Sequence, residues 1–270
     1  MLLALSFPAV DPVAISLGPL AIRWYALAYV AGLILGWRAV RGLAHRHPGV
    51  MSDKDVDDLL LWATIGVVVG GRLGYVLVYN PVYYLHHLQD VFAIWQGGMS
   101  FHGGLVGVTA AIVIFCRMRK LRLLRVADLV ACQVPIGLFF GRLANFINGE
   151  LWGRPTDAPW GMIFPDPRSG GVPRHPSQLY QALLEGVLLY LILWQWRRRT
   201  GARTRPGELT GVFCMGYALA RIVGELFRQP DPQLGFLVAG TTMGQLLSVP
   251  LFLFGLWLFV RARWLAARKT

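Results

Sequence analysis

The sequence predicts an all-α polytopic membrane protein with about seven transmembrane helices. Of its 270 residues, 55% are hydrophobic and only 15% are charged, which is less charge than a typical soluble domain carries. Apolar runs near the ~20 residues needed to span a bilayer recur along the chain. The basic residues gather between these runs, so the net charge of +12 indicates membrane orientation rather than nucleic-acid binding.

Seven apolar runs define the predicted spans. They are residues 17–38, 58–79, 91–116, 127–147, 177–196, 208–228 and 241–261. Segments 38–54, 117–125, 197–205 and 261–269 together hold 18 Lys and Arg residues. Segments 1–16, 80–90, 148–175 and 228–240 together hold four. Because Lys and Arg favour cytoplasmic connections, the N-terminus is expected outside and the C-terminus in the cytoplasm. We expect one integral-membrane domain over 1–270, with an outward loop or head region at 148–175.

Four arginines lie inside the predicted spans, each toward its outer end: Arg23, Arg72, Arg142 and Arg221. A charged side chain within a bilayer is costly and usually functional. Snorkelling toward head groups is the alternative, chiefly for Arg23 and Arg72. The planar guanidinium suits phosphate because it donates two parallel hydrogen bonds. Convergence of these side chains predicts a phosphate site, and a phospholipid head group is the phosphate available at this depth.

Acidic and amide side chains occur at related depths. Arg221 and Glu225 are four residues apart, so they share a helix face and are expected to pair. Gln178, Gln181 and Glu185 form a polar stripe in the fifth span. A structural polar seam between helices is the alternative explanation for the glutamines.

The third predicted span carries four glycines around His102, between Gly97 and Gly104. Glycine weakens a helix interior, and irregular backbone at depth requires neighbouring protein or a wet cavity. We therefore expect His102 beside a buried, hydrated cleft, either as an interhelical hydrogen-bond donor or as a proton acceptor. Ser100 and His102 also suggest a serine hydrolase, but the glycine pattern of a nucleophile elbow is absent.

Taken alone, these residues predict an outward-facing membrane site for a lipid phosphate, with a transferase as one candidate. A transporter or flippase for an anionic lipid is the rival class, and the irregular third span would fit it. No inverted repeat is evident, however. A non-catalytic lipid-binding scaffold is the third alternative.

Residues 141–153, Gly-Arg-Leu-Ala-Asn-Phe-Ile-Asn-Gly-Glu-Leu-Trp-Gly, resemble the signature of the bacterial prolipoprotein diacylglyceryl transferases. Segments 97–104, 174–180 and 225–230 are also similar to that family, so the resemblance covers essentially the whole chain. It implies transfer of the diacylglyceryl group of phosphatidylglycerol to the lipobox cysteine thiol of a prolipoprotein. A thioether forms and glycerol phosphate leaves, as the first step of bacterial lipoprotein maturation.

The resemblance also implies roles for individual residues. The candidate catalytic residues are His102, Arg142, Arg221 and Glu225. The candidate substrate-binding residues are Tyr25, Asn145, Asn148, Glu150, Gly153 and Tyr217, to which we add Arg72 for its position inside a span. His102 is the first candidate for base or proton relay, with a glutamate second. Gly153 is expected to permit close backbone approach, with an ordinary turn glycine as the alternative.

The expected partners follow from this chemistry. They are phosphatidylglycerol, prolipoprotein signal peptides with a lipobox cysteine, and membrane lipids. No nucleic acid, metal or organic cofactor is expected, because the leaving group is already a phosphodiester. The expected location is the bacterial inner membrane, with the site toward its outer, periplasmic face.

Overall fold

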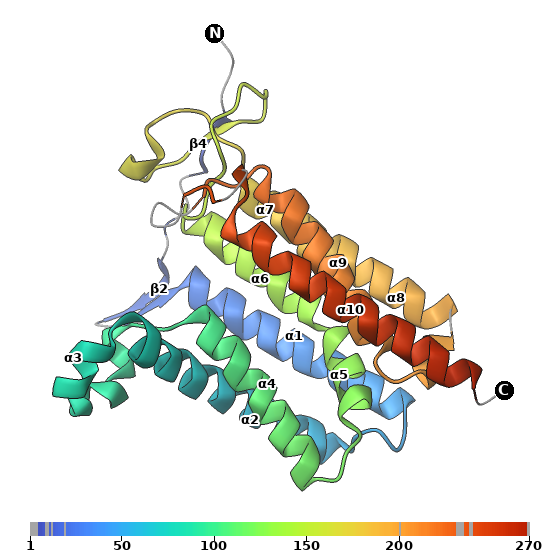
Figure 1. Cartoon of the computed structure of the whole chain (residues 1–270). Helices are drawn as coiled ribbons and strands as arrows, with labels where there is room; N and C mark the ends of the chain where they lie inside the picture. The colour runs from blue at the N-terminus through green and yellow to red at the C-terminus, as the bar shows by residue number, and fades with distance from the viewer. Residues whose placement is uncertain are drawn as a thin grey trace. The chain divides into compact units, whose positions relative to one another are not determined.

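The computed structural model describes residues 5–8, 11, 13–18, 20–199, 201–230, 235–237 and 240–268 (Figure 1). These residues are predominantly helical, as predicted. The chain forms two compact units. Unit 1 comprises Met1–Ala39 and Ala127–Thr270, and unit 2 comprises Val40–Val126.

Unit 1 opens with short strands and continues with helices. The strands are β1 (Leu5–Ser6), β2 (Val13–Leu17), β3 (Leu20–Arg23) and β4 (Met162–Ile163). The helical elements are α1 (Trp24–Arg46), α5 (Leu123–Ala131), α6 (Val134–Ile147), η4 (Pro167–Ser169), α7 (Ser177–Gln181), η5 (Ala182–Leu188), α8 (Leu189–Arg199), η6 (Gly201–Thr204), α9 (Glu208–Glu225) and α10 (Met243–Ala267). Helices α1 and α5 each continue across the boundary with unit 2.

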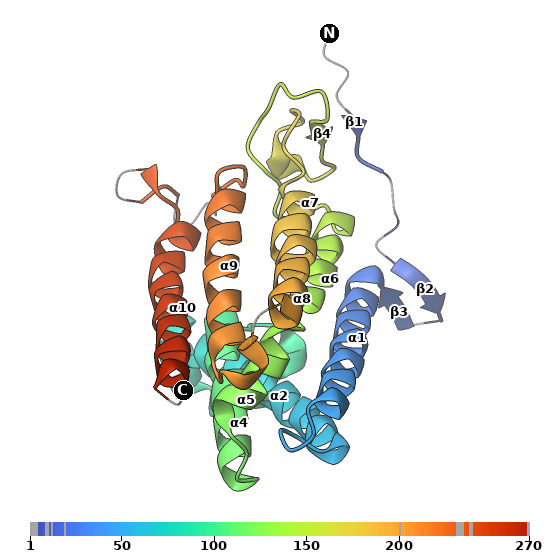
Figure 2. The same ribbon diagram turned by 90° about the vertical axis from the view of Figure 1, so that its right-hand side faces the viewer.

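Helices α9 and α10 lie side by side along their length (Figure 2). Small residues permit this approach: a Cβ on Gly211 would lie 2.7 Å from the carbonyl oxygen of Gly255, and one on Gly255 would lie 2.8 Å from Cβ of Cys214. Cys214 is therefore a packing residue. Cys116 and Cys132 are likewise buried free thiols.

The start of α9 is stabilised by a side chain from another helix. Asp128 of α5 accepts hydrogen bonds from the backbone N–H groups of Gly207 and Thr210 and from the Thr210 hydroxyl, each at 2.8 Å. The first N–H groups of a helix have no partner within the helix, and a carboxylate there also suits the helix dipole. This contact ties α5 to α9 inside unit 1.

Unit 2 is a helix pair with a short helical excursion. Its elements are α2 (Asp53–Gly74), η1 (Tyr75–Tyr79), α3 (Pro81–His86), η2 (Leu88–Phe92), η3 (Ile94–Gln96) and α4 (Phe101–Met118). Helices α2 and α4 run side by side through glycines spaced four apart (Figure 1). A Cβ on Gly66 would lie 2.7 Å from the Gly107 carbonyl oxygen, and one on Gly74 would lie 2.7 Å from Cα of Gly103. The two backbones are thus in contact, which only residues without a side chain allow.

Five helices of the described residues are long and apolar enough to cross a membrane. They are Trp24–Arg46, Asp53–Tyr79, Phe101–Met118, Ser177–Arg199 and Met243–Ala267. Helices α5 and α6, which are bent by 41° at their junction, count as a sixth if the pair is one span. Of the seven predicted spans, residues 208–228 are thus left outside this set, because α9 includes three charged residues, Glu208, Arg221 and Glu225.

Two local predictions are wrong. The first span was expected from residue 17, but Val13–Leu17 and Leu20–Arg23 pair as antiparallel strands β2 and β3, and Arg23 is exposed in β3 rather than inside a helix. The third span was expected from residue 91, yet α4 starts only at Phe101, because the four glycines lie at or before its first turn.

The loop 148–175 forms a compact head on the helices of unit 1. Its strand β4 pairs in parallel with β1, and Pro155 and Met162 each form a bridge with Arg174. Phe164 is buried in its centre and contacts the ring of Phe7 at a centroid distance of 5.3 Å. Phe164 of the loop and Phe7 of the N-terminal segment therefore pack together in the head.

Candidate active site

Five charged side chains of unit 1 form a buried cluster, here called the arginine–glutamate cluster. Its members are Arg142 of α6, Glu185 of η5, Arg221 and Glu225 of α9, and Arg228. The Nε and Nη2 atoms of Arg142 donate to Oε2 of Glu185 at 3.0 and 2.9 Å. Nη2 of Arg221 lies 2.7 Å from Oε1 of Glu225, which confirms the predicted pair. Nη1 of Arg228 lies 3.2 Å from the same oxygen.

Glu185 is the member that connects two helices. Its side chain is fully buried, and its Oε1 lies 3.8 Å from Nη1 of Arg221 while Oε2 binds Arg142. The residue lies within the π-helical stretch η5, a conformation that is rare and often found at functional sites. Its neighbour Gly186 packs directly on α6, where an added Cβ would lie 2.7 Å from Cβ of Phe139. This close approach brings Glu185 within reach of Arg142.

The cluster contains polar atoms without a hydrogen bond. Within the described part of the chain, Nη1 of Arg221 and Oε1 of Glu185 are buried, lie 3.8 Å apart and make no hydrogen bond. A buried guanidinium donor without an acceptor is costly unless a partner binds it. The cluster is therefore suited to an anion with several acceptor oxygens.

The segment after α6 is held in place by amide contacts. Nδ2 of Asn145 donates to Oε1 of Glu150 at 2.7 Å, and Nε2 of Gln178 donates to the Glu150 carbonyl oxygen at 2.6 Å. Gln178 and Gln181 are buried, in agreement with a polar seam between helices. Asn148 is exposed at the C-cap of α6. Asn145 and Glu150 thus orient each other, and Asn148 lies outside these contacts.

Gly153 occupies a site where no side chain fits. Its N–H donates to the His175 carbonyl oxygen at 2.9 Å, and it forms an antiparallel bridge with Arg228. An added Cβ would lie 2.5 Å from the His175 carbonyl oxygen and 2.6 Å from that of Phe227. Its φ is not positive, so close backbone approach, and not a turn conformation, explains the glycine. Burial also lowers the pKa of the neighbouring His175, which favours its neutral ring.

The two tyrosines of the predicted site also belong to unit 1. The hydroxyl of Tyr25 lies 3.2 Å from that of Tyr29. Tyr217 lies one helical turn before Arg221 on α9 and is partly buried. Unit 1 therefore combines the predicted residues from α1, α6 and α9 with the arginine–glutamate cluster.

Two predicted site residues belong to unit 2, and their surroundings differ from expectation. His102 lies in the first turn of α4 with an exposed side chain, so the expected burial is wrong. Arg72 is buried in α2, but its guanidinium donates to four backbone carbonyl oxygens rather than facing an open site. Substrate binding by Arg72 is therefore not supported by its contacts.

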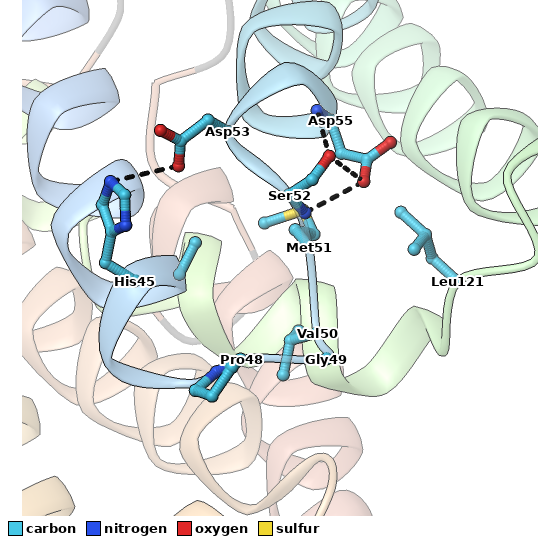
Figure 3. A pocket seen from close by; sticks show the side chains of 10 residues that line it. His45, Pro48, Gly49, Val50, Met51, Ser52, Asp53, Asp55 and Leu121 are labelled. Carbon is cyan, nitrogen blue, oxygen red and sulfur yellow. Dashed lines mark hydrogen bonds and ion pairs between the residues drawn. The ribbon is translucent and has the colours of Figure 1, made fainter.

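Unit 2 also has a hollow that is separate from the predicted site residues (Figure 3). It has a volume of about 460 Å³ and is lined by nine residues between Ala44 and Asp55 and by Leu121. Its polar groups already pair with each other: His45 lies 3.1 Å from Asp53, and Ser52 donates to Asp55 at 2.6 Å. None of the predicted catalytic or substrate-binding residues lines this hollow.

Sequence reasoning missed two members of the cluster as site residues. Glu185 was noted as part of a polar stripe, and its position as the single acid of an apolar span was the available signal. Arg228 follows Glu225 by three residues, a spacing that favours pairing at a helix end. The bond from Glu185 to Arg142 spans 43 positions, which no local pattern reveals.

Comparison with known proteins identifies the family of the chain. A family model described as prolipoprotein diacylglyceryl transferase matches residues 12–261. The chain is 58% identical to a phosphatidylglycerol–prolipoprotein diacylglyceryl transferase of Rhodospirillum rubrum, over 97% of this chain and 96% of that protein. A protein of the same name from Paramagnetospirillum magneticum is 58% identical, over 95% of this chain and 95% of its own length. Another from Azospirillum brasilense is 57% identical, over 97% of this chain and 98% of its own length. The chain therefore belongs to the prolipoprotein diacylglyceryl transferase family.

Proposed function

We propose that this protein transfers the diacylglyceryl group of phosphatidylglycerol to the lipobox cysteine thiol of prolipoproteins. The names of its relatives support this activity. The structural observation that carries the proposal is the arginine–glutamate cluster, because its guanidiniums and the unsatisfied donor of Arg221 suit the phosphodiester of an anionic lipid. Phosphatidylglycerol, the signal peptide of the prolipoprotein and the surrounding lipids are the partners, and no metal or organic cofactor takes part.

In the proposed reaction, the cysteine sulfur attacks the carbon of the diacylglyceryl group that bears the phosphate. The new S–C bond forms as the C–O bond to phosphate breaks, and glycerol phosphate leaves with the bonding electrons. Arg142 and Arg221 bind the phosphate oxygens and stabilise the charge that develops on them. The unsatisfied Nη1 of Arg221 is the donor best placed to accept a new partner without breaking an existing hydrogen bond.

The thiol must lose its proton, because the thiolate is the nucleophile and a free cysteine has a pKa of ~8.5. We assign this proton to His102 as base or relay, with a glutamate as the second candidate. The exposed imidazole of His102 favours proton exchange with solvent or substrate. Glu225 serves the cluster by orienting Arg221 and Arg228.

The remaining residues position the substrates. Asn145 and Glu150 orient each other beside α6, and Gly153 permits the backbone packing that holds the head. Tyr25 and Tyr217 add hydroxyl groups that bind substrate in unit 1. Asn148 binds substrate at the exposed end of α6. One family model covers both units, which supports a single transferase domain over 1–270 with an outward head region at 148–175.

We further propose seven spans in the bacterial inner membrane, with the site toward the periplasmic face. These are the six candidate spans described above and α9. The 18 residues of α9 extend ~27 Å, close to the hydrocarbon thickness. Its charged residues do not argue against this, because Glu208 pairs with Arg205 and Arg221 pairs with Glu225. The asymmetry of Lys and Arg supports an outer N-terminus and a cytoplasmic C-terminus.

Purified protein mixed with phosphatidylglycerol and a lipobox peptide is expected to yield a peptide heavier by one diacylglyceryl group. Mass spectrometry measures the adduct, and an enzymatic assay measures the released glycerol phosphate in equal amount. A peptide with serine in place of the cysteine is the control and should remain unmodified. Movement of labelled lipid between leaflets without an adduct would indicate a transporter, and binding alone would indicate a scaffold.

The Arg142→Lys variant is expected to lower kcat/KM for transfer about 100-fold, because lysine retains the charge but cannot bind two oxygens in parallel. Arg205→Lys is a matched control, since Arg205 also pairs with a fully buried glutamate in unit 1, and it should retain activity. Both proteins should be recovered from the membrane in equal amount. Full activity of Arg142→Lys would exclude the phosphate role.

The His102→Asn variant is expected to slow transfer about 100-fold at neutral pH, because the thiol loses its proton acceptor. The defect should shrink as the pH rises through ~8.5, where the thiol ionises without help. Rates measured between pH 6 and pH 10 test this, with the exposed His86→Asn as control. A constant ratio of variant to wild-type rate across that range would contradict the role.

Single cysteines on either side of α9 are expected to differ in accessibility. In a variant lacking the three buried native cysteines, Gln229→Cys should react with a membrane-impermeant maleimide in intact spheroplasts. Thr204→Cys should react only after permeabilisation. Gel shift of the labelled protein reports both reactions. Labelling of both sites from the same side would show that α9 does not cross the membrane.

A further inference from the structure

Arg72 is a buried cation whose contacts are backbone carbonyls. Its Nε donates to Val91 O at 2.8 Å, and its Nη2 donates to Asp90 O at 2.5 Å. Its Nη1 donates to Gly97 O at 2.5 Å and to Gly98 O at 3.2 Å. The side chain is only 4% exposed. All three guanidinium nitrogens thus bind a single stretch of chain, residues 90–98, which we call the carbonyl segment.

The carbonyl segment leads directly into the start of α4. Ser100 lies two residues beyond the end of the carbonyl segment, and its N–H donates to the Gly71 carbonyl oxygen at 2.8 Å. Its side-chain hydroxyl caps α4 by accepting a hydrogen bond from the Gly103 N–H at 3.1 Å. Since Gly71 immediately precedes Arg72, two successive residues of α2 hold the chain on either side of Met99. His102 then lies in the first turn of α4, two residues beyond the cap.

Packing confines the same segment from other directions. Gly98 has a φ of +78°, and an added Cβ would lie 2.5 Å from Cε1 of Tyr75 and 3.0 Å from Nη1 of Arg72. The guanidinium carbon of Arg72 also lies 5.2 Å from the centre of the Tyr84 ring, within range of a cation–π interaction. The Tyr83 hydroxyl donates to the Asp90 side chain at 2.6 Å. The segment therefore has one defined position.

We propose that Arg72 is a positioning residue, which sets the location of His102 by holding the carbonyl segment, and that it does not bind the lipid phosphate. This inference rests on the proposed role of His102. A phosphate would have to displace four carbonyl acceptors to reach this guanidinium, which would leave those carbonyls without their donor. Irregular backbone within a membrane protein needs such a partner, because lipid supplies none.

Lysine at position 72 would keep the charge but lose the geometry. The three N–H donors of an ammonium are all on one nitrogen, whereas those of a guanidinium are on three nitrogens and reach carbonyls that lie apart. Arg72→Lys is therefore expected to release part of the carbonyl segment. Arg119→Lys is the matched control, because Arg119 lies in the same unit and pairs with the Asp58 side chain rather than with backbone.

Hydrogen–deuterium exchange with mass spectrometry tests the structural part without catalysis. Amides of residues 90–102 are expected to exchange about tenfold faster in Arg72→Lys than in wild type, and at the wild-type rate in Arg119→Lys. If Arg72→Lys cannot be purified, Gly98→Ala displaces the same segment from Arg72 and Tyr75 and should give the same increase. Unchanged exchange in these amides would overturn the proposal.

Kinetics test the link to His102. Arg72→Lys is expected to lower kcat with an unchanged KM for phosphatidylglycerol, and to show the same recovery at high pH as His102→Asn. The double variant should be no more than about twofold slower than His102→Asn alone, because both changes remove one function. A raised KM, or losses that multiply in the double variant, would show that Arg72 binds the lipid and would refute positioning. Inactive wild-type protein would instead refute the proposed function, while exchange would still decide whether Arg72 holds the segment.

Discussion

Two guanidiniums from different helices, Arg142 of α6 and Arg221 of α9, approach one fully buried carboxylate, that of Glu185. Without this carboxylate, two positive charges would repel each other in a medium of low dielectric constant. The π-helical stretch and the contact of Gly186 with α6 place Glu185 where both arginines reach it. The geometry of the cluster in unit 1 therefore depends on this shared ion pair.

Glu225 extends the same principle along α9, since it binds Arg221 and Arg228. Nη1 of Arg221 has no hydrogen-bond partner among the described residues. A cluster in which every guanidinium donor is satisfied would have little affinity for a lipid phosphate, whereas arginines without carboxylate partners would destabilise the fold. The pairing in this cluster orders the arginines and leaves the Nη1 donor of Arg221 available for an anion.

Unit 2 uses a buried arginine differently. The guanidinium of Arg72 donates to four backbone carbonyl oxygens, whose dipoles take the place that a carboxylate has in the arginine–glutamate cluster. This arrangement orders a segment whose glycines would otherwise leave it with many conformations. The α2–α4 glycine contact provides the rigid base for it. A buried arginine in this family member is therefore not, by itself, a sign of phosphate binding.

The sequence by itself determined the helical membrane class and the Arg221–Glu225 pair, because the first depends on composition and the second on spacing within one helix. The resemblance of residues 141–153 to the family signature is likewise a property of the sequence alone. Only the tertiary structure decided the partners of Arg142 and Arg72. Arg142 binds a carboxylate 43 positions away, and Arg72 binds carbonyls 18 to 26 positions away. Helical periodicity relates only residues within a few turns. Contacts between distant segments depend on how the backbones pack, and here glycines set this packing. Arg142 and Arg72 therefore have different partners, although both were predicted to lie inside spans.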